Sequence, residues 1–222
     1  MAHKIKIPRK EIIQPDAFVT FSEKMALATS QHKGRLIAGI AGLILLALAW
    51  AGFNYSQHAN ALKMEKLLFD MKQIQDKEDG EAELKAKYDE LKAGSYRNRG
   101  ALILADSQFQ KGDFDAALAL YSEVEATASP EGLQYQLATL GMGYSHEAKK
   151  EYDKAIAAFK TLIGQSHGFP LFDVYAGMVR CYELKKDPGN ALLILREMEG
   201  KFQDHSQLNW VERRIAKLSA AS

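Results

Sequence analysis

The chain has 222 residues, 47% of them hydrophobic and 26% charged, with a formal net charge of +1. Residues 1–35 hold seven Lys or Arg against three acids, whereas residues 36–222 hold 22 basic and 25 acidic residues. A basic face that could neutralise several phosphates is absent, which excludes nucleic acid as an expected partner. Cys181 is the single cysteine, so an intramolecular disulfide is excluded, and its apolar neighbours predict a buried thiol.

An uncharged run of 18 residues, 36–53, follows the basic leader 1–35. At about 1.5 Å per residue it spans about 27 Å, close to the roughly 30 Å hydrocarbon core of a bilayer, which predicts a single transmembrane helix. Because Lys and Arg concentrate before the run, we expect a cytoplasmic N-terminus and later residues on the far side of the membrane. Cleavage as a signal peptide, after the small residues of Ala59-Asn60-Ala61, is the alternative.

Two further patterns lie at the start of the chain. In the leader, Asp16 is placed to cap a short amphipathic helix, although a disordered basic tail fits the composition equally. At the membrane, Gly34, Ala38 and Gly42 recur every four residues. Such small-residue spacing allows another transmembrane helix to approach closely, which predicts dimerisation or docking through this face.

From residue 54 onward apolar residues recur at three- and four-residue steps, without convincing period-two alternation, so we expect an all-α domain. Residues 54–97 form the helical stem and first helices of this domain. Within them, the charged cluster 76–80 is expected to end one helix, and Gly94 to end the next as a left-handed cap.

An internal repeat dominates residues 98–222. The segments KGDFDAALALYSEV, KEYDKAIAAFKTLI and KDPGNALLILREME align with one another, and another helical segment precedes each. In each, an Ala is followed four residues later by a bulky residue, and the alanines are 38 and 36 residues apart. These pairs are Ala117 with Tyr121, Ala155 with Phe159, and Ala191 with Leu195. Twelve residues before the alanines lie Ala105, Gly143 and Val179.

Small residues at these positions allow two antiparallel helices to approach to about 8–10 Å. Phe114, Tyr152 and Pro188 are expected to begin the second helix of each pair, and Asp113 and Asp187 to cap it. The pattern therefore predicts stacked helical hairpins that form a solenoid.

These residues resemble the tetratricopeptide repeat, in which a small residue of the first helix meets an Ala of the second and a bulky residue follows four positions later. The resemblance covers Asn98 to about Met198, with a period above the usual 34 and with Val179 where a small residue is expected. It implies a solenoid of helical hairpins, which here follows the transmembrane helix predicted from the apolar run 36–53.

The layout of basic leader, transmembrane helix and degenerate repeats, with the segment LGMGYSHEAKKEYDKAIAAF, is also similar to the YfgM-like ancillary subunits of the bacterial Sec translocon. That resemblance implies an inner-membrane protein whose periplasmic domain acts as an ancillary or chaperone-like factor. Translocon subunits, periplasmic chaperones or exported chains would be its partners. The alternative is a homo-oligomeric scaffold that organises another cell-envelope complex.

Motifs for catalysis, cofactors and metals are not found. The six histidines stand singly, without metal-ligand spacing. Gly141-Met142-Gly143 lacks the third glycine and the preceding strand of a dinucleotide loop, and close helix packing explains it better. Ser145 and His146 are adjacent on a helix, about 100° apart, and cannot form a relay. We therefore expect a non-enzyme without cofactor or metal.

Projection of the helix periodicity places a mixed aromatic and charged set on the concave face of the solenoid: Asp106, Phe109, Tyr144, Glu147, Arg180 and Glu183. Such a lining suits an extended or helical peptide better than a small molecule. For Phe109 and Tyr144 individually, packing in the core is the competing interpretation.

A last amphipathic helix begins at Ser206. Its apolar face consists of Leu208, Val211, Ile215 and Leu218. We expect it to cap the open end of the solenoid, with docking of another protein as the alternative. An exposed Trp210 would favour docking.

Overall fold

The computed structural model describes residues 33–77, 79–165 and 168–220. The chain divides into two compact units, Met1–Asn60 and Ala61–Ser222. In the described residues all regular structure is helical, in agreement with the predicted all-α class. Of the first unit the structure describes the beginning of helix α2 (Lys33–Ile74). The short helix predicted after Asp16 lies outside the described residues.

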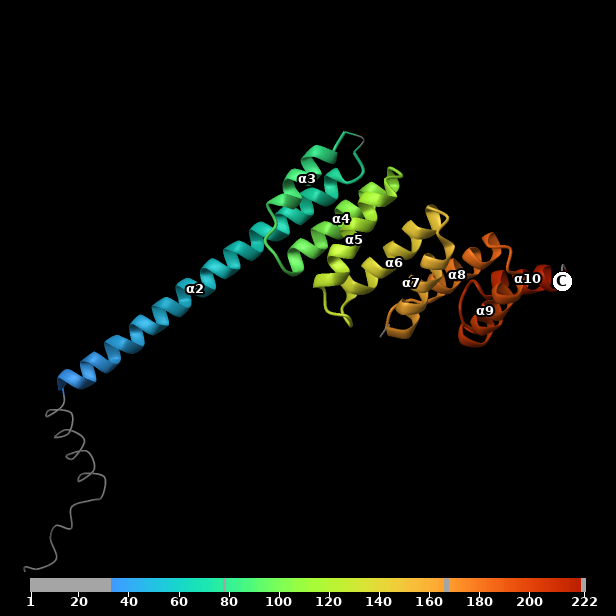
Figure 1. Ribbon diagram of the computed structural model, residues 1–222. Helices are drawn as coiled ribbons and strands as arrows, with labels where there is room; N and C mark the ends of the chain where they lie inside the picture. The colour runs from blue at the N-terminus through green and yellow to red at the C-terminus, as the bar shows by residue number, and fades with distance from the viewer. Residues whose placement is uncertain (1–32, 78, 166–167, 221–222) are drawn as a thin grey trace, which may run out of the picture. The chain divides into compact units, whose positions relative to one another are not determined.

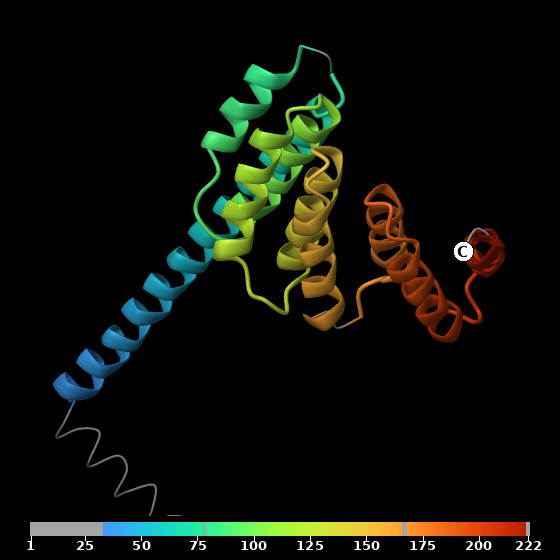
Figure 2. The same cartoon turned by 45° about the vertical axis from the view of Figure 1, so that its right-hand side comes forward.

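The second unit is a series of helical hairpins that follow one another in chain order (Figures 1 and 2). After α2 the helices are α3 (Glu81–Asp89), α4 (Ser95–Gln110), α5 (Phe114–Thr127), α6 (Leu133–Ala148), α7 (Tyr152–Gln165), α8 (Phe172–Leu184), α9 (Pro188–Lys201) and α10 (Leu208–Ala220). From α3 to α10, each helix contacts the next, and α6 also contacts both α4 and α8. This stacking is the predicted solenoid; α4, α6 and α8 are the first helices of its hairpins.

The turn inside each hairpin repeats along the chain. A residue with a left-handed backbone follows each first helix: Gly112 at φ 84°, Lys150 at φ 62° and Lys186 at φ 58°. The next residue precedes the second helix, and in two hairpins it is Asp113 or Asp187, whose carboxylate accepts a hydrogen bond from the backbone amide three residues on. Both predicted N-caps are confirmed, and α5, α7 and α9 begin at the predicted residues.

The end of α3 differs from the prediction. This helix ends at Asp89, and Gly94, at φ 102° and ψ −156°, immediately precedes α4. The expectation that Gly94 caps the preceding helix is wrong. Gly94 is instead the residue before α4, and its positive φ, which favours glycine, allows the chain to turn into that helix.

Two clusters of buried side chains fill the second unit. One, around Met71, is formed by helices α2 to α6, and the other, around Phe159, by α7 to α10. Helix α6 borders both, because Ala138 belongs to the first cluster while Leu140 and Tyr144 pack against the second. The residues that the sequence assigns to repeat packing are all buried: Ala105, Ala117, Tyr121, Gly143, Ala155, Phe159, Ala191 and Leu195.

Glycines make room for the large rings between the helices. A Cβ added at Gly143 of α6 would lie 2.4 Å from the Phe159 ring, and one at Gly177 of α8 would lie 2.9 Å from the same ring. A Cβ at Gly141 would lie 2.3 Å from the Tyr121 ring. Both distances on α6 are shorter than the non-bonded distances that Cβ atoms show in folded proteins, so a side chain at either glycine would displace the ring that it faces.

Candidate functional site

One arginine–glutamate pair links α6 to α8, and a second links α8 to α10. Arg180 of α8 donates from Nε and Nη2 to the two carboxylate oxygens of Glu147 on α6, at 2.8 and 2.9 Å. Arg214 of α10 makes the same two-bond contact with Glu183 of α8. These hydrogen bonds raise the pKa of both guanidinium groups, which therefore stay charged.

The corresponding positions of α4 and α6 hold aromatic residues instead. With repeat offsets of 38 and 36 residues, Phe109 corresponds to Glu147, and Tyr144 corresponds to Arg180. No arginine–glutamate pair joins α4 to α6 among the contacts of the described residues. The junction between these two helices is therefore chemically different from those that follow it.

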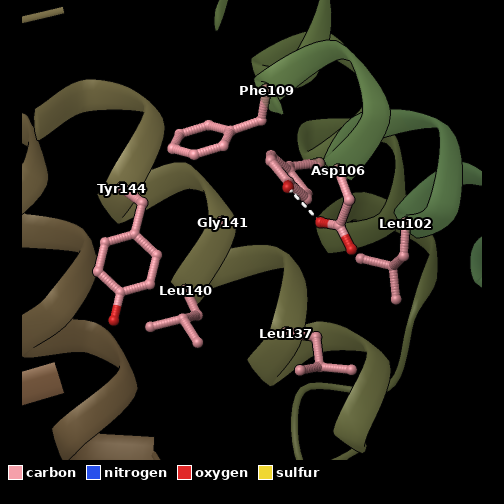
Figure 3. A pocket seen from close by; sticks show the side chains of 8 residues that line it. Leu102, Asp106, Phe109, Leu137, Leu140, Gly141 and Tyr144 are labelled. Atoms are coloured by element: carbon pink, nitrogen blue, oxygen red, sulfur yellow. Dashed lines mark hydrogen bonds between the residues drawn. The ribbon is translucent and has the colours of Figure 1, made fainter. Parts of the chain in front are cut away.

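A pocket of about 290 Å³ lies at this junction (Figure 3). Its walls are three leucines and three aromatic side chains: Leu102, Leu137, Leu140, Phe109, Tyr121 and Tyr144. Asp106 of α4 also lines it, and its Oδ1 accepts a hydrogen bond from the Tyr121 hydroxyl at 2.6 Å. Burial raises the pKa of Tyr121, so this phenol remains a neutral donor.

The structure brings three of the six predicted face residues to this pocket: Asp106, Phe109 and Tyr144. The Phe109 ring packs edge-on against Phe114 at a centroid distance of 5.3 Å, and the Tyr144 ring against Phe159 at 5.5 Å. Each ring therefore both packs on the core and lines the pocket. The remaining three residues form the ion pairs described above: Glu147, Arg180 and Glu183. A role of any of the six in binding stays a prediction.

An adjoining cavity of about 450 Å³ extends the apolar surface. It shares Leu102 and Leu137 with the first pocket and adds Leu133. Leu133 is 63% exposed and Leu137 is 39% exposed, so two large apolar side chains face solvent here. Leu133 and Leu137 are not among the residues predicted from the sequence to line this face. Their spacing, with Leu140, of i, i+4 and i+7 on one helix face is the signal that could have found them.

The C-terminal helix α10 packs against the core of α7 to α9. Val211 is fully buried, and Trp210 is partly buried, with its ring 6.3 Å from that of Phe172. A cavity of about 630 Å³ is lined by these two rings and by Arg180. Trp210 is therefore not the exposed aromatic residue that would favour docking of another protein on this helix.

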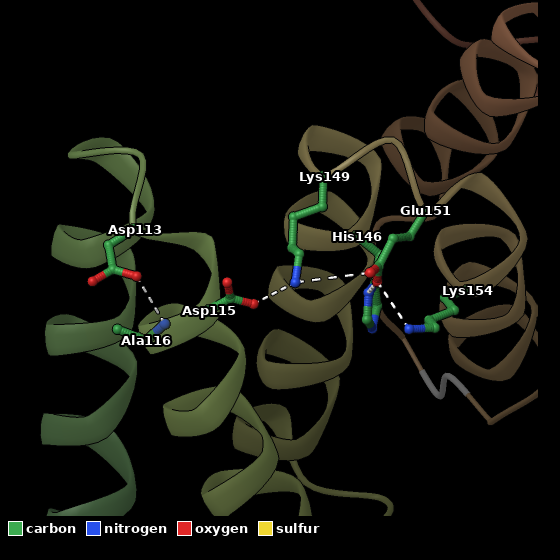
Figure 4. A network of polar contacts seen from close by, with 7 residues as sticks. All are labelled: Asp113, Asp115, Ala116, His146, Lys149, Glu151 and Lys154. Atoms are coloured by element: carbon green, nitrogen blue, oxygen red, sulfur yellow. Dashed lines mark hydrogen bonds and ion pairs between the residues drawn. The ribbon is translucent and has the colours of Figure 1, made fainter.

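A second set of ion pairs joins the turns of neighbouring hairpins (Figure 4). Lys149, which follows α6, pairs with Asp115 of α5 and lies 3.8 Å from Glu151. Glu151 also lies 2.7 Å from Nδ1 of His146 and 3.1 Å from Nζ of Lys154. Equivalent contacts are Lys111 with Glu81 and Lys185 with Asp153. These ion pairs connect neighbouring repeats, and the sequence pattern did not predict them.

The apolar part of α2 contains a segment that could cross a membrane by length and composition, and none of that segment is buried. Gly34, Ala38 and Gly42 lie on α2, and a Cβ added at Gly34 or Gly42 would meet no atom within 4 Å. Their role in helix association stays a prediction.

Candidate reactive groups are few. In the part of the chain that the structure describes, no group of three or more His, Cys, Asp or Glu could hold a metal ion. The Cys181 side chain is fully buried, as predicted, and burial raises the pKa of its thiol to about 12. A thiol in such surroundings is inert.

Comparisons with known proteins agree with this architecture. The Tetratricopeptide repeat-like domain family matches residues 30–168. A crystal structure from Podosopora anserina, described as a kinesin light chain with nearly identical TPR-like repeats, is similar at a TM-score of 0.59 and 13% identity. The similarity covers 73% of this chain and 86% of that one, and at this identity it shows the fold alone. A search of curated proteins finds no match. The chain thus belongs to the tetratricopeptide repeat-like domain family.

Proposed function

We propose that the chain is a membrane-anchored protein-binding module that uses the face formed by α4, α6, α8 and α10. Repeat solenoids suit this role because each hairpin adds to one extended surface. The observation that carries the proposal is the apolar pocket between α4 and α6, whose lining includes Phe109, Tyr144 and the exposed Leu137. Exposed apolar surface in a depression is typical of sites that bind proteins.

The dimensions of the site favour a polypeptide over a small molecule. Pockets for drug-sized ligands measure about 300–1,000 Å³, and the first pocket, at about 290 Å³, is at the lower limit. It continues into a second cavity through Leu102 and Leu137. Two adjoining hollows suit successive side chains of one peptide. The proposal assigns the chain no catalytic residue, cofactor or metal.

We further propose that the repeats lie in the bacterial periplasm, at the inner membrane. The apolar segment of α2 supports an anchor, and the basic leader 1–35 supports a cytoplasmic N-terminus. The similarity in layout to YfgM-like translocon subunits supports a place beside the Sec machinery. Its partners would be translocon subunits, periplasmic chaperones or exported chains.

Site-specific photocrosslinking tests the binding face. A benzophenone amino acid at Leu137, in the wall of the pocket, should crosslink to a secretion component or an exported chain in intact membranes. The matched control carries the same probe at Leu193, a leucine of α9 that is 63% exposed. Equal crosslinking at both positions, or none at Leu137, would contradict the proposal. Crosslinks from Leu137 to a second copy of the chain would instead favour the oligomeric scaffold.

Reporter fusions at both ends test the orientation. A reporter active only in the cytoplasm should work at the N-terminus, and one active only in the periplasm should work after Ser222. The opposite pattern, or a chain that is soluble after export, would refute membrane anchoring with periplasmic repeats.

A further inference from the structure

The carboxylate of Asp106 on α4 differs from the two glutamates, Glu147 and Glu183, that link α6, α8 and α10. Glu147 and Glu183 each receive two hydrogen bonds from an arginine. Asp106 takes part in no ion pair given by the described side chains, and it receives one hydrogen bond, from the neutral Tyr121 hydroxyl. Its negative charge is therefore not neutralised within the repeat.

The walls around this carboxylate are apolar and aromatic. Leu102 and Phe109 line the pocket from α4, beside Asp106, and Leu140 and Tyr144 line it from α6, across the hollow from Asp106 (Figure 3). Aromatic faces attract a cation within about 6 Å, and leucines cover the methylene stem of a long side chain. The pocket thus combines one negative charge with surfaces that suit a long side chain bearing a positive end.

The size of the pocket limits what it can hold. A cavity of about 150 Å³ lined by apolar side chains accommodates one benzene molecule. The pocket here is about 290 Å³, enough for one long side chain. An acidic side chain would meet the unneutralised charge of Asp106, which disfavours it by like-charge repulsion.

We propose that the α4–α6 pocket binds the side chain of a lysine or arginine in a partner polypeptide, with its positive end on Asp106. The methylene stem lies between the leucines and the rings of Phe109 and Tyr144. An apolar neighbour of the bound residue occupies the adjoining cavity beside Leu133 and Leu137. This inference rests on the proposed function and specifies the chemistry of the segment that is bound.

The absence of a glutamate–arginine pair at this junction supports the assignment. Elsewhere on the same face, Arg180 fills the position in front of Glu147, whereas Tyr144 stands at the position equivalent to Arg180. The residues that line the α4–α6 pocket therefore include a carboxylate and aromatic rings but no Lys or Arg, and the nearby arginines lie outside it: Arg99 lines the adjoining cavity, and Arg180 is 5.9 Å from the Tyr144 ring. The partner supplies the cation.

An array of short synthetic peptides of random composition tests the inference. The full chain in detergent micelles is applied as wild type, as Asp106→Asn and as Asp204→Asn, a matched control in the loop before α10. Asn at position 106 keeps an acceptor for the Tyr121 hydroxyl, so the fold should be preserved. Circular dichroism checks this.

We expect the wild type and the control to retain peptides in which Lys or Arg adjoins a bulky apolar residue. Asp106→Asn should lose the preference for the basic residue and bind a selected peptide about tenfold more weakly in fluorescence anisotropy, the loss of one charge-assisted contact. Replacing the basic residue of that peptide with Gln should have a similar effect on the wild type and little effect on Asp106→Asn.

Two results would overturn the inference and are distinguishable from each other. Binding of peptides without a preference for Lys or Arg, or with a preference that survives Asp106→Asn, refutes the basic-residue site but leaves protein binding intact. Failure of the folded wild type to retain any peptide refutes the inference and also counts against the proposed peptide-binding function.

Discussion

The packing of Phe159 against Gly143 leads to a quantitative prediction for Gly143→Ala. The added methyl would lie 2.4 Å from the ring, whereas ordinary contacts begin at 3.4 Å, so the ring must retreat by about 1 Å. Retreat is restricted, because the ring is also close to Gly177 of α8. Overpacking of this kind costs about 1–3 kcal/mol, and the higher helix propensity of Ala returns about 1 kcal/mol.

Gly143→Ala should therefore lower the free energy of unfolding by roughly 0–2 kcal/mol. Gly164→Ala provides the control, because Gly164 also lies in a helix but a Cβ there meets no atom within 4 Å. That variant should gain up to about 1 kcal/mol from helix propensity alone. The difference between the two variants, about 1–3 kcal/mol, measures the steric contribution.

Urea unfolding of the full chain in detergent micelles, followed by far-ultraviolet circular dichroism, measures both changes. Combining Gly143→Ala with Phe159→Leu should relieve the clash, so the double variant should be more stable than the sum of the single effects predicts, by at least about 0.5 kcal/mol. If Gly143→Ala is as stable as Gly164→Ala, or if the two substitutions are additive, the close-packing argument is refuted.

Three further predictions concern the thiol, a helix cap and pH. Because Cys181 is buried and its thiol pKa is about 12, iodoacetamide at neutral pH should modify it only on unfolding, and rapid labelling of the native chain would contradict this. Asp113→Ala removes the hydrogen bond from the Ala116 amide and should lower the free energy of unfolding by about 1 kcal/mol, as measured by urea unfolding. An unchanged unfolding midpoint would contradict the role of Asp113 as an N-cap. The Tyr175 hydroxyl lowers the pKa of Glu197, so this carboxylate stabilises the fold above the ordinary glutamate pKa of about 4.3, and its contribution is lost as pH falls through the lowered value. Glu197→Gln should be less stable than wild type at neutral pH, with the difference vanishing in acid, and a difference independent of pH would argue against this assignment.

Local signals in the sequence predicted the hairpins well. An aspartate followed by Phe114 or Pro188 marks a helix start through contacts between near neighbours, so these boundaries agree with the structure. Gly94 was misassigned because a glycine with positive φ can end one helix or begin the approach to the next. A single sequence cannot separate the two when a loop of several residues lies between the helices.

The candidate site was only partly predictable. Helical spacing places Asp106 and Phe109 on one face of α4, because that relation is set within a single helix, whereas Tyr144 of α6 joins them in the pocket through the stacking of two hairpins. The pairing of Glu147 with Arg180 joins residues 33 apart and depends on the rotation between neighbouring repeats. The helical periodicity of the sequence does not determine the rotation between repeats. It therefore predicts neither which charged residues form ion pairs nor which apolar side chains remain exposed to solvent.

Helix α6 belongs to both halves of the repeat domain, since it touches the α2–α6 cluster through Ala138 and the α7–α10 cluster through Leu140. Unfolding of α6 would separate the two clusters of buried side chains, whereas α10, at the end of the stack, can unfold locally while the other helices stay folded. Amide protons of α6 should consequently exchange with deuterium among the slowest in the molecule. A ligand bound in the pocket beside Gly141 would slow this exchange further. Hydrogen exchange of α6 would therefore report whether the pocket is occupied.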